Sequence, residues 1–406
     1  MKAIYLFSNY YPYGMVAESF LMDELQVVSQ MPCCYVEVIP LHKNEFRRDL
    51  PSNIVLNTKL SDTSLLQKMK AFFSMILGRF FWLIPFQRKY SPKSRSDYFQ
   101  AIKYLYGSYL IRDFLLRNKD DFKEGAIFYS YWFNHTPLGF CMAKEMCRNF
   151  EKSKIYTRAH GFDVYEDSVG TYFPFRNKVL SMIDRVFVVS GKGVSCLKQR
   201  YPIFSEKIDV SRLGVFPHHV KQDVEKCWDI SILSCSSVVP IKRVDLIFDS
   251  INRFCQVYGH LKVKWTHIGG GKGFDTLQKG IKSKECNLTI DLAGSVDKPE
   301  VMEIYKRGYF NLFVNLSLSE GIPVAIMEAI SWGIPVLATD VGGNKEIVTE
   351  DTGLLLAVDF VQKQFNDSVL TLMENREALS KSTFEFYLKN YNAEINYTNF
   401  YMNQLK

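Results

Sequence analysis

Residues 319–340 read SEGIPVAIMEAISWGIPVLATD, and this stretch predicts a loop, an apolar helix and a buried strand in succession. Pro323 suits the first turn of a helix, because its missing N–H would have no helical partner there in any case. Gly333 and Pro335 end the helix, since glycine favours the C-terminal turn and proline cannot continue it. The stretch therefore predicts part of a parallel α/β sheet.

Two carboxylates border this helix with seven residues between them. Glu320 falls in the loop before the helix, and Glu328 lies about one and a half turns into it. The glycine after Glu320 leaves backbone N–H groups at the helix N-terminus, where an anion binds well. Carboxylates do not bind phosphate, but they accept hydrogen bonds from sugar hydroxyls. A ligand with hydroxyls at both ends and phosphate between them, a nucleotide sugar, matches this layout.

Strands alternate with helical segments along both halves of the chain, which is the pattern of βαβ units and parallel sheets. We therefore expect an α/β fold with two doubly wound domains that face each other across a cleft. Ligands in such sheets bind at the carboxyl ends of the strands. The expected strands are residues 2–7, 35–39, 126–132, 154–161, 185–190, 207–214, 228–237, 262–270, 287–294, 310–317 and 334–343.

The polar segment 215–227 separates the two series of strands, and we place the domain boundary there. The expected N-terminal domain is 1–218, with a basic, aromatic insertion at about 66–98. The expected C-terminal domain is 219–385 and holds the nucleotide sugar. The final residues, 386–406, are expected to form a helix that packs back on the N-terminal domain.

The bulk composition is that of a globular protein, with 47% hydrophobic and 23% charged residues and a net charge of +7. The charge favours phosphates or an acidic membrane surface as partners, and the density of Lys and Arg is too low to favour nucleic acid. The nine cysteines form no CxxC pair and no metal-ligand spacing, which is typical of reduced thiols in the cytoplasm. The N-terminus predicts a first strand and not a signal peptide.

Residues 68–95 interrupt the α/β rhythm with seven Lys or Arg, no acid and several Phe and Trp. The apolar centre is shorter than the ~20 residues of a membrane-spanning helix. One interpretation is an amphipathic segment that lies on an anionic membrane surface. The other is an insertion whose apolar face packs on its own domain.

The run from Glu320 to Leu355 resembles the E-x7-E signature of the retaining GT-B glycosyltransferases of family 4, the glycosyl transferases group 1 of bacterial polysaccharide biosynthesis. The matching residues are Glu320-Gly-Ile-Pro, Glu328-Ala, Gly333-Ile-Pro-Val, Asp340-Val-Gly-Gly-Asn-Lys-Glu-Ile-Val and Thr352-Gly-Leu-Leu. The resemblance implies a GT-B fold of two Rossmann-like domains. It also implies transfer of a sugar from a nucleotide-diphosphate donor with retention of anomeric configuration.

Within the resemblance, Lys242 corresponds to the lysine that neutralises the donor diphosphate. Ser237 stands where the family commonly has an arginine, and Arg243 is the candidate to replace that cation. Glu320 would hold the hydroxyls of the transferred sugar, and Glu328 would hold the ribose. Further donor-binding positions are Gly270 of the turn 268–271, Gly294, Ser295 and Val296 of the base-contacting loop, and Gly321, Ile322 and Pro323.

In the N-terminal half, residues 157–166 resemble the family's H-G-x-D at a strand end, which makes His160 the candidate near the reacting sugar carbon. His135 has no such context, and we interpret it as structural or as an acceptor-side residue. Residues 10–20 resemble the glycine-rich cleft loop, with Gly14 and Met15 on the acceptor side, although Ala17 stands where relatives often have glycine.

The predicted function is a retaining glycosyltransferase that uses a UDP- or GDP-sugar as co-substrate and no other cofactor. No DxD metal signature is present, so no metal is expected. The acceptor would be a glycan or a lipid-linked hydroxyl in polysaccharide or lipopolysaccharide synthesis, at the cytoplasmic face of the membrane. The alternatives are a non-catalytic nucleotide-sugar-binding protein at the membrane, and a GT-B-like epimerase or phosphorylase.

Overall fold

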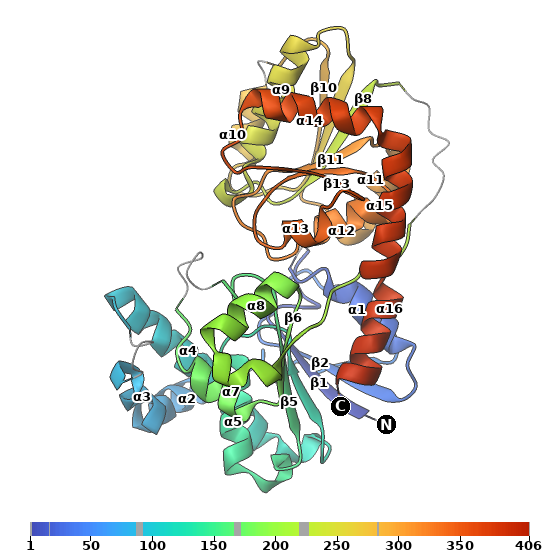
Figure 1. Cartoon of the computed structure of the whole chain (residues 1–406). Coiled ribbons are helices and arrows are strands. Elements are labelled where there is room, and N and C mark those ends of the chain that lie inside the picture. The colour runs from blue at the N-terminus through green and yellow to red at the C-terminus, as the bar shows by residue number, and fades with distance from the viewer. Residues whose placement is uncertain are drawn as a thin grey trace. The chain divides into compact units, whose positions relative to one another are not determined.

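The computed structural model describes residues 2–15, 17–86, 92–165, 172–218, 227–281 and 284–405. The chain forms two compact units (Figure 1). Unit 1 comprises Met1–Ser211 and Tyr397–Lys406, and unit 2 comprises Arg212–Asn396. Most of the boundary segment 215–227, namely 219–226, lies outside the described residues.

Unit 1 is built on a parallel sheet whose described strands follow the order β3-β2-β1-β4-β5-β6-β7. The chain moves outward from β1 to β3, and then returns to the other side of β1 with β4, which makes the sheet doubly wound. Strand β1 is apolar and buried along nearly its whole length, as expected for a strand covered on both faces. The strands are β1 (Lys2–Ser8), β2 (Cys34–Pro40), β3 (Ile54–Leu56), β4 (Ile127–Ser130), β5 (Lys154–Ala159), β6 (Arg185–Val188) and β7 (Ile208–Val210).

Helices connect the strands of unit 1, and several pack on its core. The longest, α4, begins at a capping box in which Ser94 and Asp97 bond each other's backbone N–H. The α-helices are α1 (Leu21–Ser29), α2 (Leu65–Leu77), α3 (Arg79–Trp82), α4 (Arg95–Arg117), α5 (Thr136–Met146), α7 (Arg176–Met182) and α8 (Gly191–Arg200).

Unit 2 repeats the doubly wound plan with the strand order β10-β9-β8-β11-β12-β13, again parallel throughout the described residues. Its strands are β8 (Ile230–Cys235), β9 (Val263–Ile268), β10 (Leu288–Gly294), β11 (Leu312–Asn315), β12 (Val336–Thr339) and β13 (Gly353–Leu356). Its α-helices are α9 (Val244–Val257), α10 (Phe274–Gly280), α11 (Lys298–Arg307), α12 (Val324–Ser331), α13 (Asn344–Ile347), α14 (Gln362–Glu374), α15 (Arg376–Asn390) and α16 (Ala393–Asn399), which continues into unit 1.

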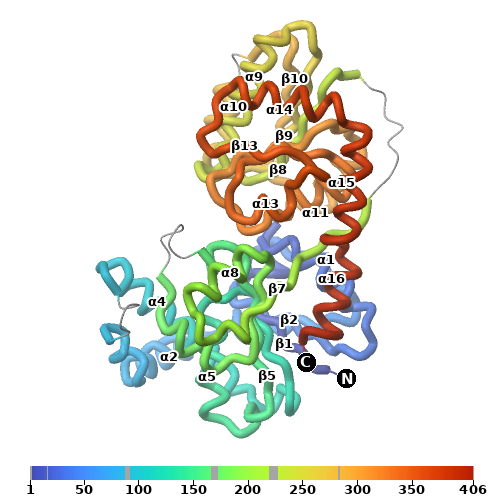
Figure 2. Tube along the Cα trace, in the orientation of Figure 1, coloured from blue at the N-terminus to red at the C-terminus, as the bar shows by residue number. Residues whose placement is uncertain are grey.

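The last ten residues complete unit 1, so both chain ends lie side by side there (Figure 2). Lys2 Nζ donates to the carbonyl oxygen of Leu405 at 2.8 Å. Deeper in unit 1, the fully buried Arg158 donates to Glu24 at 2.7 Å, and Tyr401 donates to the same carboxylate at 3.0 Å. A buried ion pair therefore fixes the C-terminal segment to the first sheet.

The expected α/β fold with two doubly wound parallel sheets is confirmed, and the eleven expected strands are all present. Strands β3 and β13 were not expected. In the part of the chain that the structure describes, no helix is both long enough and apolar enough to cross a membrane.

Candidate active site

In unit 2, the winding direction of the sheet reverses between β8 and β11, which are neighbours. At such a switch point, the loops that follow the two strands diverge and leave a crevice at their carboxyl ends. The loop after β8 carries Lys242, and the loop after β11 carries Glu320. The fold thus places both sequence-predicted residues where a parallel α/β sheet binds its ligand.

Lys242 and Glu320 form an ion pair, with Lys242 Nζ 2.6 Å from Glu320 Oε1. The same oxygen accepts hydrogen bonds from Ser317 Oγ at 2.7 Å and from Asn315 Nδ2 at 3.3 Å. Glu320 is buried, whereas the Lys242 side chain is partly exposed. The carboxylate is therefore held in position from within the protein, and the lysine beside it has access to solvent.

Two glycines support the Glu320 loop from below. Gly342 has a positive φ of 51°, and a Cβ built on it would lie 1.7 Å from the carbonyl oxygen of Glu320. The N–H of Gly343 donates to the carbonyl oxygen of Gly321 at 2.8 Å. The Gly-Gly pair lets two backbones meet at a distance that no side chain permits. Ile322 and Pro323 of the same loop are buried, and Pro323 caps α12.

Arg243 adopts a left-handed conformation at the N-cap of α9. Its Nε donates to the carbonyl oxygen of Leu316 at 2.6 Å, and its Nη1 donates to that of Val358 at 2.9 Å. Burial lowers the pKa of its guanidinium. Arg243 thus ties the loops after β8, β11 and β13 together. A role on the donor diphosphate rests on Nη2, which is buried and has no partner.

Glu328 lies on α12 and is buried. Lys298 Nζ of α11, a residue that sequence reasoning missed, is 4.0 Å from Glu328 Oε1. Burial raises the pKa of the Cys235 thiol at the end of β8, and the charge of Glu328 raises it further. Burial likewise raises the pKa of Tyr305. Glu328 thus belongs to a buried polar cluster at the end of β8.

The loops after β8, β9 and β10 are joined through their backbones. Val238 N–H donates to Gly270 O at 2.7 Å, and Gly269 N–H donates to Gly294 O at 2.9 Å. A Cβ on Gly270 would lie 2.4 Å from Ser295 Oγ. The structure therefore gathers these loops along one sheet edge, with the exposed Ser237 and Ser295 and the half-buried Val296 on them.

Unit 1 carries its own candidate residue, His160, directly after β5. Its ring centroid lies 4.4 Å from that of Trp132 and 5.0 Å from that of Tyr131, and both ring nitrogens are buried without a hydrogen-bond partner. Burial lowers the pKa of His160 well below its usual range, and Arg158 lowers it further. His160 is therefore a neutral imidazole whose polar atoms are available to a ligand.

Two buried carboxylates that were not predicted shape the surroundings of His160. Asp163 accepts hydrogen bonds from the N–H of His160 at 2.7 Å and from that of Phe133 at 3.0 Å. Glu18 accepts from the N–H of Tyr10 and of Tyr11, both at 2.7 Å, and also from Trp132 Nε1. The Asp163 signal was present in the quoted H-G-x-D, but a carboxylate that binds backbone is not distinguishable by sequence from one that binds substrate.

The loop with Gly14 and Met15 is fastened by backbone contacts. Gly14 has a φ of 87°, and its N–H donates to Phe46 O at 2.8 Å. The buried Arg48 donates to the carbonyl oxygens of Met15 and Ala17. The Met15 side chain is exposed. His135 is packed away in the core, where Gly107 leaves room for its ring, and burial lowers its pKa to about 4.

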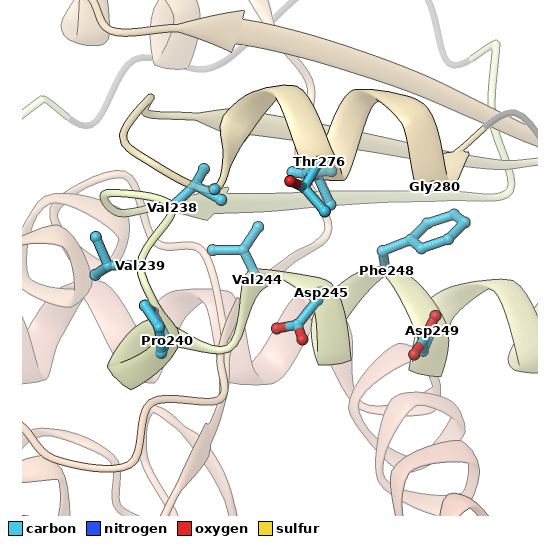
Figure 3. Close-up of a pocket in the computed structure, with 11 residues that line it drawn as sticks. Val238, Val239, Pro240, Val244, Asp245, Phe248, Asp249, Thr276 and Gly280 are labelled. Atoms are coloured by element: carbon cyan, nitrogen blue, oxygen red, sulfur yellow. The ribbon is translucent and has the colours of Figure 1, made fainter.

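A pocket of about 500 Å³ opens on the flank of unit 2 between α9 and α10 (Figure 3). Asp245 and Asp249 of α9 and Thr276 of α10 line it together with apolar residues from both helices. Lys242, Glu320 and Glu328 are not part of its lining. Among the described residues, no group of three or more His, Cys, Asp or Glu is placed to hold a metal ion.

Comparison with known sequences places unit 2 in a recognised class. Residues 221–384 match the family of glycosyl transferases group 1. In human phosphatidylinositol N-acetylglucosaminyltransferase, the matching polypeptide is 31% identical over 128 residues, 31% of this chain and 25% of that protein. N-acetyl-alpha-D-glucosaminyl L-malate synthase of Bacillus anthracis is 25% identical over 229 residues, 53% and 57% of the two chains. The O-antigen biosynthesis glycosyltransferase WbnH of Escherichia coli is 31% identical over 153 residues, 37% and 40% of the two chains.

Solved structures share the fold of the whole chain at low sequence identity. The lipopolysaccharide outer core galactosyltransferase WaaB has a TM-score of 0.64 at 15% identity, with 100% of both chains covered. Anabaena HepE in complex with UDP has a TM-score of 0.61 at 13% identity, with 99% and 98% covered. The N-terminal domain of Candida albicans trehalose-6-phosphate phosphatase has a TM-score of 0.69 at 13% identity, with 100% and 96% covered.

The chain therefore has the GT-B type of fold, with two doubly wound α/β units. Within that fold, unit 2 is a glycosyltransferase domain of the glycosyl transferases group 1. The chain spans between 25% and 57% of the length of the sequence relatives described above.

Proposed function

We propose that the chain is a retaining glycosyltransferase that moves a sugar from a UDP- or GDP-sugar to a hydroxyl group of a glycan or lipid-linked acceptor. The observation that carries the proposal is the Lys242–Glu320 pair at the switch point of unit 2. A cation and a carboxylate in contact suit a ligand that is anionic at one point and hydroxylated at the next. A nucleotide sugar has this character at its diphosphate and its transferred sugar.

In this proposal, Lys242 meets the diphosphate as it becomes the leaving group, together with the backbone N–H groups that follow Glu320. Fixed donors of this kind stabilise developing negative charge without reorganisation. Glu320 receives hydrogen bonds from the sugar hydroxyls, since Ser317 and Asn315 already hold it in place. These protein cations and dipoles would do the work without a metal ion.

The proposed reaction breaks the bond between the anomeric carbon and the phosphate oxygen. A bond from the acceptor oxygen to the same carbon forms on the same face. The acceptor proton passes to the departing phosphate oxygen, so the products are the glycoside and the nucleoside diphosphate. His160 would contact the sugar near its reacting carbon, where its unpartnered ring nitrogens can accept or donate a hydrogen bond.

The proposed donor site extends over the joined loops of unit 2. Backbone groups near Gly294, Ser295 and Val296 would contact the base, and Glu328 would contact the ribose. UDP is named in the HepE complex, and N-acetylglucosamine or galactose transfer is named in the human relative and in WaaB. These names favour a UDP-sugar for this chain.

The proposed acceptor is part of a cell-surface glycan or a lipid-linked precursor at the cytoplasmic face of the membrane. The support comes from relatives whose names specify O-antigen biosynthesis and transfer to phosphatidylinositol. Both names describe products that contain or are assembled on lipid. The assignment rests on analogy between sites on a shared fold.

The test is nucleoside diphosphate release from a panel of UDP- and GDP-sugars, measured for the wild type, for Glu320→Gln and for the matched surface control Glu350→Gln. We expect slow release from one donor, lost in Glu320→Gln and kept in Glu350→Gln, with product of retained configuration once an acceptor is found. Equal release by all three proteins would overturn the assignment of Glu320. Tight donor binding with no release on any acceptor would favour the non-catalytic alternative.

Release of a free sugar epimer without acceptor would identify an epimerase. A requirement for inorganic phosphate would identify a phosphorylase. Donor turnover that disappears when the protein is treated with EDTA and returns with a divalent cation would contradict the metal-independent chemistry.

A further inference from the structure

Helix α2 of unit 1 leaves its largest apolar face in solvent. Of its thirteen residues, only Ala71 and Met75 are buried. The exposed large apolar side chains of α2 are Leu65, Leu66, Met69, Phe72, Phe73 and Leu77. The interpretation that this insertion packs its apolar face on its own domain is therefore wrong for α2.

The exposed residues form one continuous face. At roughly 100° per residue, the apolar side chains from Phe72 to Leu77 span about 140° of the helix circumference, and Ala71 and Met75 lie outside this arc. On the same projection, Lys68 falls at one edge of the arc and Lys70 at the other. An apolar stripe with lysines at both margins is the arrangement of a helix that lies in a membrane interface.

The apolar surface continues beyond α2. In the short helices that follow, Trp82 is 65% exposed and Phe86 is 75% exposed, whereas Phe80 and Ile84 point into the core. On the neighbouring helix α4, Tyr106 contacts Phe72, and Phe99 lies two turns earlier on the same side of that helix with an exposed ring. The surface thus spans α2, α3, the turn Ile84–Phe86 and the start of α4.

The charges around this surface have one sign. Between Asp62 and Asp97 the sequence holds seven Lys or Arg and no acid. Lys68 and Lys70 flank the α2 stripe, and Lys103 lies over the ring of Phe99 at 4.7 Å from its centroid. Monomeric proteins rarely expose so many neighbouring aromatic and aliphatic side chains unless the surface binds something. A basic margin favours an anionic partner.

We propose that α2, α3, the turn Ile84–Phe86 and the start of α4 form a docking surface for an anionic lipid bilayer. The aromatic and aliphatic side chains enter the acyl region, and the lysines remain at the level of the lipid phosphates. The surface fixes unit 1 to one leaflet without crossing it. This inference goes beyond the proposed sugar transfer and does not depend on it.

The experiment is vesicle flotation with the full chain. One set of vesicles contains phosphatidylcholine alone, and the other contains phosphatidylcholine with roughly 30% phosphatidylglycerol. We expect the wild type to float only with the anionic vesicles. The triple variant Phe73→Ser/Leu77→Ser/Trp82→Ser should bind at least about tenfold less, since three exposed apolar groups are lost. The matched control Ile203→Ser changes an apolar residue of unit 1 that is 89% exposed elsewhere, and should float like the wild type.

Three results would overturn the proposal. The wild type does not bind anionic vesicles, or the triple variant binds as well as the wild type. In the third, light scattering shows a wild-type dimer that the triple variant cannot form, with no vesicle binding, so the surface joins two copies of this chain. Because all substituted side chains are exposed, thermal unfolding should be unchanged. Donor release in solution, measured on the same proteins, separates a failure of this inference from a failure of the proposed transferase.

A second variant tests the role of charge. Lys68→Gln/Lys70→Gln should weaken binding to anionic vesicles, and added salt should weaken wild-type binding in the same way. Trp82 gives an independent signal, since its fluorescence should shift to shorter wavelength on anionic vesicles and this shift should be absent in Trp82→Phe. An unshifted Trp82 on bound vesicles would contradict insertion.

Discussion

Lys242 Nζ and Glu320 Oε1 lie 2.6 Å apart although 78 positions separate the two residues in the sequence. The doubly wound sheet makes this contact, because β8 and β11 are neighbours whose following loops start at the same edge. In the unliganded pair each charge neutralises the other. A diphosphate that binds Lys242 would weaken this contact and leave the Glu320 carboxylate to accept hydrogen bonds from the sugar. Donor binding and sugar orientation would then be coupled.

The first prediction concerns this coupling. Lys242→Met should raise the Kd for the nucleoside diphosphate by about tenfold or more, because a charge-assisted hydrogen bond to the phosphate is lost. Glu320→Gln should leave that Kd nearly unchanged and abolish transfer. Titration calorimetry with UDP and with GDP measures the first effect. The two substitutions should be non-additive in the double variant, and additive effects would contradict direct coupling.

The second prediction concerns the support of the Glu320 loop. Gly342→Ala should lower the free energy of unfolding by at least about 2 kcal/mol, since its Cβ would meet the Glu320 carbonyl oxygen at 1.7 Å from a left-handed backbone. Donor turnover should fall as well. Gly259→Ala is the matched control in unit 2, because a Cβ added there would meet nothing within 4 Å. Urea unfolding of both variants measures the difference, and equal stability would contradict the close approach.

The third prediction concerns pH. Burial lowers the pKa of His135 from 6.5 to about 4. The unfolded chain therefore binds a proton at a higher pH than the folded one, and the stability from this residue is lost as pH falls below about 6.5. Between pH 7.5 and pH 5 the loss should be about 2 kcal/mol.

The measurement is urea unfolding of the wild type and His135→Gln at both pH values. Other titrating groups are common to the two proteins, so the advantage of the wild type should shrink by the predicted amount at pH 5. A pH-independent difference would show that His135 is not buried in its neutral form.

The fourth prediction concerns the buried pair of unit 1. Glu24→Gln leaves the Arg158 charge buried without a counter-ion, which should lower the free energy of unfolding by about 3–5 kcal/mol. The double variant Glu24→Gln/Arg158→Met should recover part of this loss, because the uncompensated charge is gone. Thermal and urea unfolding check both. Glu124→Gln breaks the exposed pair with Lys152 and should have no measurable effect.

The order of strands and helices followed from hydrophobic patterning, since each long apolar run was buried on both faces. The two strands that were missed are short and weakly marked. Strand β3 has three residues, and β13 begins at a glycine. Such segments become strands only because a neighbouring strand offers a free edge, which is a tertiary effect.

The candidate site was predictable only in part. The positions of Lys242 and Glu320 followed from family resemblance, and the switch point explains why they meet. Ser317 and Asn315 could not be predicted, because a serine or asparagine near a strand end is common and its partner is defined by the folded loop. The anchoring of Arg243 on backbone carbonyls is likewise invisible in a local sequence pattern.

The return of the chain from unit 2 to unit 1 has a consequence for biosynthesis. Tyr401 is among the last residues to leave the ribosome, and it is also a donor to the buried Glu24 near the N-terminus. Unit 2 is one continuous segment, so it has all of its residues before unit 1 does. A nascent chain must hold the Glu24–Arg158 pair without Tyr401 until translation ends. A premature stop codon ten residues early would therefore spare the glycosyltransferase domain and damage the opposite end of the protein.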